Sequence, residues 1–96
     1  MASRRLHEET RARTAERLER LTALLAARSR IEELLPLLQE VSDDEAAVLL
    51  STELECSPTS AFLVLQSPLR TFTSRRVGDA LRSEVGDLTQ RLREIP

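Results

Sequence analysis

Apolar residues recur at helical spacing through most of this chain, and the longest stripes lie near its two ends. Between residues 4 and 28, Leu18, Leu21 and Leu25 follow one another at steps of three and four, which places them on one face of a predicted helix. Residues 1–12 contain few apolar side chains. We therefore expect the first turns of this helix to fray or to wait for a partner.

The last segment carries the most regular stripe. Over residues 74–95 the apolar positions alternate steps of four and three, at Leu81, Val85, Leu88, Leu92 and Ile95. This spacing is a heptad seam about two heptads long, the pattern of a coiled coil. An isolated helix would leave such a seam in water. We predict that the protein self-associates or binds a helical partner through the two stripes, at Leu18, Leu21, Leu25, Leu81, Val85, Leu88, Leu92 and Ile95.

Serine and proline divide the middle of the chain into shorter helices. Ser29-Arg30-Ile31-Glu32 fits a capping box, which predicts a new helix or a bend at Arg30. Pro36 interrupts the apolar stripe that follows, so we expect a kink or a restart there. Ser42-Asp43-Asp44-Glu45 fits a second capping box and predicts a helix that stops before Pro58.

Two Ser-Pro pairs, Ser57-Pro58 and Ser67-Pro68, each place a capping residue before a proline at the first helical position. The apolar run 61–65 between them has the length of either a buried strand or a buried helical turn. The Ser-Pro start and the helical surroundings favour a helix.

Composition supports an all-helical fold. Leu, Ile, Val and Phe make up 27 of 96 residues, 18 of them Leu, whereas only two residues are aromatic. We expect one domain spanning residues 1–96, a small all-α bundle of four or five helices with long first and last helices and short, proline-punctuated helices between them. A core of this size is marginal, which favours association.

Charge is segregated along the chain. Residues 1–30 carry eight Arg and four Glu, residues 31–56 carry eight acids and no base, and residues 57–96 carry six Arg and four acids. This pattern predicts that the flanks fold back on the acidic centre or that one chain docks on another. Folding or assembly should then weaken as salt rises and as pH falls.

Residues suited to catalysis are few. His7 is the only imidazole and lies in the polar terminus, and Cys56 stands between acidic residues that disfavour a thiolate. The acids at 43–45 fit helix capping better than metal binding, because EF-hand spacing and its turn glycine are absent. We expect no enzyme activity, no cofactor and no metal. No apolar run approaches the length of a membrane span, so we expect an intracellular, cytoplasmic protein, or a nuclear one in a eukaryote.

One stretch, residues 50–65, resembles the helix-turn-helix of many bacterial regulators. The positions that would match are Leu50, Ser51, Leu54, Cys56, Ser57, Ala61 and Val64. The turn glycine is replaced by Glu55, which must adopt an unfavourable backbone or a different turn. Residues 62–65 offer no basic or amide side chain that could read bases.

The function that we expect is that of a non-enzymatic adaptor or assembly subunit, oligomeric or part of a complex, that works by contact between helices. The alternative is a small nucleic-acid-binding regulator that uses residues 50–65 or an arginine face made by Arg70, Arg75, Arg76 and Arg82. An acidic phosphate-mimicking inhibitor built on residues 32–55 ranks last, because that segment is too rich in Leu to be all surface.

Overall fold

The computed structural model describes residues 2–95 and contains six α-helices in that range. They are α1 (Ala2–Ser29), α2 (Ile31–Gln39), α3 (Asp43–Leu54), α4 (Pro58–Gln66), α5 (Arg70–Thr73) and α6 (Arg75–Glu94). The described residues contain no strand, so the all-α expectation is confirmed, and residues 58–66 are helical. The expected count of four or five helices is wrong. The additional helix is α5, a single turn that the extended backbone of Ser74 separates from α6.

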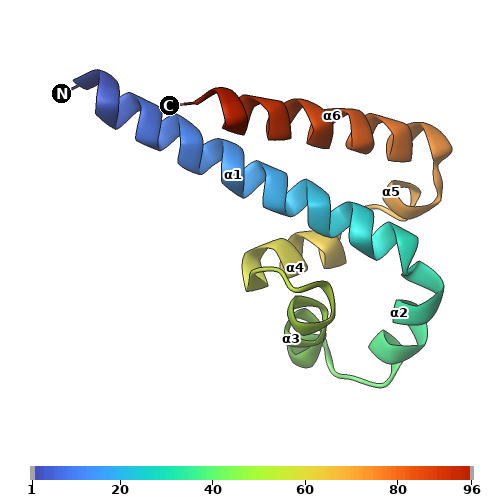
Figure 1. Ribbon diagram of the computed structural model, residues 1–96. Coiled ribbons are helices and arrows are strands. Elements are labelled where there is room, and N and C mark those ends of the chain that lie inside the picture. Colours follow the sequence, from blue (N-terminus) through green and yellow to red (C-terminus); the bar gives the residue numbers. More distant parts are fainter. Residues whose placement is uncertain (1, 96) are drawn as a thin grey trace.

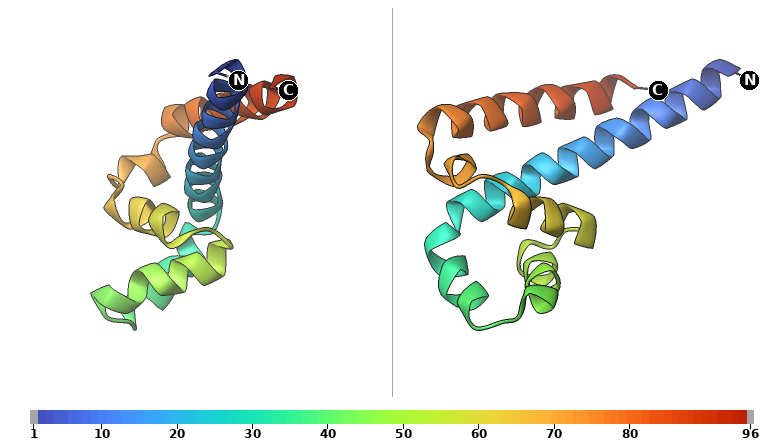
Figure 2. Two further views of the ribbon diagram at one scale, coloured as in Figure 1. Left: turned by 90° about the vertical axis from the view of Figure 1, so that its left-hand side faces the viewer. Right: turned by 180° about the vertical axis from the view of Figure 1, so that it is seen from behind.

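The two long helices, α1 and α6, lie side by side and run in opposite directions (Figure 1). The shorter helices α2, α3 and α4 form a lobe on the opposite side of α1, and α5 fills the corner between α1 and α6 (Figures 1 and 2). The fold measures 51 × 29 × 17 Å along its principal axes. The N-terminal half of α1 is helical from Ala2 onward. The expected fraying of residues 1–12 concerns the stability of those turns and stays a prediction.

Three serines cap the helices that follow them. Ser42 accepts a hydrogen bond from the Glu45 amide at 3.3 Å, and Ser57 accepts one from the Ser60 amide at 3.2 Å. Ser74 caps α6 through the Val77 amide at 3.3 Å. The first-turn amides of a helix have no carbonyl partner within that helix, and each serine hydroxyl accepts a hydrogen bond from one of them. The capping predicted at Ser42 and at Ser57-Pro58 is therefore confirmed.

The capping box predicted at Ser29 is wrong. The Ser29 hydroxyl donates to the Ala26 carbonyl at 2.9 Å, so it belongs to the last turn of α1. Arg30 takes the capping position of α2, with no side-chain cap. An N-cap residue needs a non-helical backbone, and α1 remains helical through Ser29.

The predictions at Pro36 and at Ser67-Pro68 also need correction. The restart predicted as one alternative at Pro36 does not occur, since α2 continues through it and the missing amide leaves only the Glu32 carbonyl without its helical donor. The kink, the other alternative, stays a prediction. The Ser67 hydroxyl donates to the Leu63 carbonyl at 2.8 Å. Ser67 therefore closes α4 and does not cap the next helix.

The core lies along the C-terminal half of α1, between α6 on one side and the lobe of α2, α3 and α4 on the other. Alanines at Ala27 and Ala61 are almost completely buried, which lets α1 and α4 come close together. Each leucine buried there contributes on the order of 1.5–3 kcal/mol. The buried cluster consists of Leu21, Ala23, Leu24, Ala27, Leu34, Leu50, Ala61, Val64, Leu81 and Leu88.

Arg30 ties three helices together at the junction of α1 and α2. Its Nη2 atom lies 2.7 Å from Glu33 Oε1 and 2.8 Å from Glu53 Oε2, and Nη1 donates to the Glu53 carbonyl at 2.8 Å. The pKa of Arg30 is raised by its hydrogen bonds to Glu33 and Glu53, and the pKa of Glu33 is lowered by Arg30. The end of α3 is thereby fixed to the start of α2.

The predicted pairing of the acidic centre with the arginine flanks holds only at Arg30. Of the eight acids in residues 31–56, Glu33 and Glu53 pair with it, and the other six form no ion pair within residues 2–95. All six are exposed. The acidic segment is thus largely uncompensated within the chain.

Candidate functional site

The eight residues predicted to bind a partner lie on the facing sides of α1 and α6. Leu21, Leu81 and Leu88 are buried together. Leu18, Leu25 and Val85 pack against the same cluster, and Leu92 and Ile95 are half-buried farther along α6. The stripe on α1 and the stripe on α6 therefore pack against each other within one chain. Their use by a partner stays a prediction, and the most exposed apolar surface lies elsewhere.

Polar contacts hold the two long helices in register. Arg17 on α1 pairs with Glu84 on α6, with 2.6 Å between Nε and Oε1. Arg11 donates to the carbonyls of Leu92 and Ile95 at 3.4 and 3.3 Å, where the end of α6 leaves carbonyls without helical partners. Contacts at both the middle and the end of α6 fix its position along α1.

The helix-turn-helix resemblance has a structural counterpart. α3 and α4 are bent by 113° at the turn that joins them, within the range of such units. Glu55 adopts the left-handed conformation, with φ 51° and ψ 48°, where a glycine is usual. The Cys56 amide donates to the Ser51 carbonyl at 3.1 Å, and the Ser51 hydroxyl donates to the Cys56 carbonyl at 2.6 Å. The unfavourable backbone expected at Glu55 is therefore confirmed.

The outward face of this unit carries little that could read DNA. Phe62 and Leu65 are exposed on α4, and α3 opens with three acids, Asp43, Asp44 and Glu45. Apolar side chains offer few contacts to base edges other than thymine methyl groups, and the acids repel phosphates. Three residues of the helix-turn-helix pattern, Leu50, Ala61 and Val64, are buried. The pattern in residues 50–65 therefore reflects the packing of α3 and α4.

An apolar groove lies where α2, α4 and α5 meet at the C-terminal end of α1. Its volume is about 250 Å³. Leu69 is 71% exposed, Leu35 is 50% exposed and Leu65 is 38% exposed, so large apolar side chains on its walls face water. The groove is lined by Ala27, Ile31, Leu34, Leu35, Leu38, Leu50, Val64, Leu65, Ser67, Leu69 and Phe72.

Sequence reasoning missed this groove. The signal was present in α2, where Ile31, Leu34, Leu35, Leu37 and Leu38 are more apolar positions than one buried face of a nine-residue helix needs. Only Leu34 among them is fully buried. Four of the five line the groove, namely Ile31, Leu34, Leu35 and Leu38.

The elements on the two sides of the groove differ in charge. Glu32 is exposed on α2, and Arg70, Arg75 and Arg76 are exposed on α5 and at the start of α6. None of these four side chains forms an ion pair within the described part of the chain, although Arg70 donates to the Thr73 hydroxyl at 3.2 Å. Glu32 thus follows the groove residue Ile31 in sequence, and Arg70 follows the groove residue Leu69, so exposed charges of opposite sign adjoin two walls of the groove in sequence.

Comparison with protein-family models, with curated proteins and with solved structures found no match for this chain. The candidate site therefore rests on its own geometry. Within residues 2–95, no helix alone is long and apolar enough to cross a bilayer.

The residues with potential for chemistry lie apart from one another. His7 is exposed in the first part of α1. Burial, together with the nearby Glu19 carboxylate, raises the pKa of the Cys56 thiol, so the reactive thiolate is disfavoured. Among the described residues, no three His, Cys, Asp or Glu side chains gather as metal ligands would.

Proposed function

We propose that this chain is a non-enzymatic helical assembly subunit that acts by helix-to-helix contact, and that its partner is a second copy of itself. The apolar groove carries the proposal. Leu35, Leu65 and Leu69 are large, exposed and contiguous with buried core residues, and such surfaces mark interaction sites. Covering them removes apolar area from water, which drives most protein association.

The charges around the groove favour a second copy over an unrelated partner. A two-fold interface places the same patch on both sides, and when the two-fold axis runs along the groove each rim meets the opposite rim of the other molecule. Glu32 on α2 would then face Arg70 on α5 of the partner, twice per dimer. Both side chains are exposed and without an ion pair within residues 2–95. Complementary rims of this kind set register and orientation.

Light scattering after size exclusion tests whether the groove mediates self-association. The unmodified chain should behave as a dimer, and Leu69→Glu should shift it to a monomer because a carboxylate is then buried in an apolar contact. Val48→Glu is the matched control, since Val48 is 66% exposed on α3 and does not line the groove. A strict monomer at all concentrations, or equal loss of the dimer in both variants, contradicts the proposal.

Charge exchange tests the two-fold arrangement. Glu32→Arg and Arg70→Glu should each weaken self-association by about tenfold, because each creates two like-charge pairs. A mixture of the two variants should form a heterodimer, since all the pairs across the interface are then of opposite sign. If the mixture fails to associate while the unmodified chain dimerises, the pairing of Glu32 with the partner's Arg70 is rejected. That result does not test whether the groove mediates dimerisation.

A second candidate is nucleic-acid binding by α3 and α4, and it is favoured by the 113° bend and the left-handed turn at Glu55. The acidic first turn of α3 weighs against it. Gel shifts at near-physiological salt test it with random duplex DNA. A discrete complex that is lost in Phe62→Ala would support this candidate, because Phe62 is exposed on α4 and outside the core cluster.

A further inference from the structure

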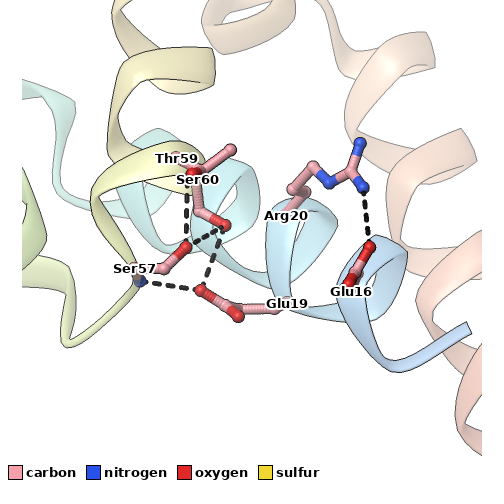
Figure 3. Close-up of a pocket in the computed structure, with 6 residues that line it drawn as sticks. All are labelled: Glu16, Glu19, Arg20, Ser57, Thr59 and Ser60. Atoms are coloured by element: carbon pink, nitrogen blue, oxygen red, sulfur yellow. Dashed lines mark hydrogen bonds and ion pairs between the residues drawn. The ribbon is translucent and has the colours of Figure 1, made fainter. Parts of the chain in front are cut away.

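A polar cluster joins the middle of α1 to the start of α4 (Figure 3). Glu19 on α1 accepts a hydrogen bond from the Ser57 amide at 2.7 Å and from the Ser60 hydroxyl at 3.1 Å, both to Oε1. Ser57 Oγ and Ser60 Oγ are 3.2 Å apart. Ser60 is only 2% exposed, so this contact reaches from the surface to the buried side of α4.

A carboxylate at this position complements the helix that it touches. The N-terminal turn of a helix has free amides and partial positive charge. Glu19 supplies an anion to α4 from a different helix, in addition to the cap that Ser57 provides. A cavity of about 270 Å³ surrounds the contact, lined by Glu16, Glu19, Arg20, Ser57, Thr59 and Ser60. Water and protons can therefore reach the carboxylate.

The same helix reaches the apolar groove at its other end. α4 begins at Pro58 beside Glu19, and its last turns carry Val64 and Leu65, which line the groove. A short helix held at one end transmits a change of tilt to the other. The Glu19 contact is thus placed to set the position of the groove wall.

We propose that Glu19 is a proton-sensitive latch that holds the start of α4 against α1 and thereby sets the shape of the groove between α2, α4 and α5. The neutral carboxyl group loses its charge-assisted bond to the Ser57 amide. The N-terminal turn of α4 then separates from α1. The regulation of assembly by this latch rests on the proposed function, whereas the latch itself does not.

The charged and titratable groups around Glu19 support the direction of the effect. Glu16 and Arg20 lie near it on α1 and pair with each other at 3.6 Å, and Glu55 and Cys56 approach from the α3–α4 turn. The hydrogen bond from the Ser57 amide is the largest contribution that lowers the pKa of Glu19. The latch is therefore closed above the ordinary Glu pKa and opens as pH falls through the lower value of the folded protein.

Nuclear magnetic resonance between about pH 7 and pH 3 tests the latch on the full chain, over the range in which a Glu carboxyl with a lowered pKa titrates. The Ser57 amide and the methyl groups of Val64 and Leu65 should shift together with one midpoint. Glu19→Gln should abolish this titration and raise exchange of the Ser57 amide at neutral pH by roughly tenfold, because a charged acceptor is replaced by a neutral one. Glu16→Gln is the matched control and should titrate like the unmodified chain.

Two outcomes overturn the proposal. One is a Ser57 titration that persists in Glu19→Gln, and the other is a Ser57 shift that leaves Val64 and Leu65 unchanged. Ser60→Ala provides a second variant that removes one contact and keeps the carboxylate, and helical content by circular dichroism shows that the variants are folded. Weaker dimerisation of Glu19→Gln would extend the latch to assembly. A chain that never dimerises rejects the proposed function and leaves the resonance measurement to decide the latch.

Discussion

The closest approach of a glycine to another element occurs where α6 crosses the end of α1. A Cβ atom built on Gly78 would lie 2.6 Å from Arg28 Nε, whereas one on Gly86 would meet no atom within 4 Å. Arg28 Nη1 donates to the Thr71 carbonyl at 3.1 Å, so the guanidinium that fills this space also holds α5. The sequence does not distinguish the two glycines of α6, but only at Gly78 do neighbouring atoms leave no room for a side chain.

Substituting each glycine by alanine should give opposite results. Gly86→Ala should stabilise the fold by about 0.5–1 kcal/mol, because alanine favours the helix and meets no obstacle. Gly78→Ala should lose this gain or destabilise the fold, because Arg28 must leave Thr71. Chemical denaturation of the two variants measures the difference. Equal stabilisation in both would show that Arg28 moves aside at no cost.

At the scale of elements, the sequence predicted the helix starts at Ser42 and Ser57 correctly, but it did not predict that Ser67 closes α4. Ser42 and Ser57 cap as predicted, and α3 stops before Pro58. The pattern failed at Ser29, because a motif of side chains does not reveal whether the preceding helix has ended. The missing glycine predicted either an unfavourable backbone or a different turn at Glu55, and the first of these is observed. The helix α5 was not predicted, because four residues carry no periodic signal.

Replacing Glu55 by glycine should stabilise the α3–α4 unit. A left-handed conformation costs a residue with a side chain about 1–2 kcal/mol, and the greater flexibility of unfolded glycine offsets part of that gain. We expect Glu55→Gly to raise the free energy of unfolding by about 0.5–1 kcal/mol. Thr52→Gly, in the exposed part of α3, is the control and should lower it by a similar amount. A destabilising Glu55→Gly would mean that its carboxylate has a role that the geometry does not reveal.

At the scale of the whole molecule, the charge segregation seen in the sequence persists in space. α2 and α3 carry acids that lack ion pairs, and they lie across α1 from the arginine-bearing α6 (Figure 1). The sequence could predict two apolar stripes. However, two helices that pack within one chain have the same apolar periodicity as helices that pack between two chains. Leu21 and Leu88 therefore could not be assigned to the core from spacing alone. The groove could not be predicted from the sequence, because it forms where α2 and α5 meet and no local sequence pattern encodes that contact.

Salt should act in opposite directions on the single chain and on the assembly. Screening relieves repulsion among the uncompensated acids of residues 31–56, so the melting temperature of the monomeric Leu69→Glu variant should rise from low salt to about 0.5 M sodium chloride. Dimerisation of the unmodified chain should weaken over the same range, because its rims attract. Thermal melts and sedimentation measure the two effects. A melting temperature that falls with salt would restore the original expectation that arginine flanks hold the acidic centre.

The pairing of α1 with α6 has a consequence for synthesis on the ribosome. Arg11 reaches carbonyls 81 and 84 residues later in the chain, and Leu88 covers the same core as Leu21. At roughly 5–20 residues per second, the 67 residues from Thr22 to Leu88 take about 3–13 seconds to translate. For that time the apolar face of α1 has no α6 to cover it. The nascent chain thus exposes the leucines of α1 that pack against α6 until α6 has been translated.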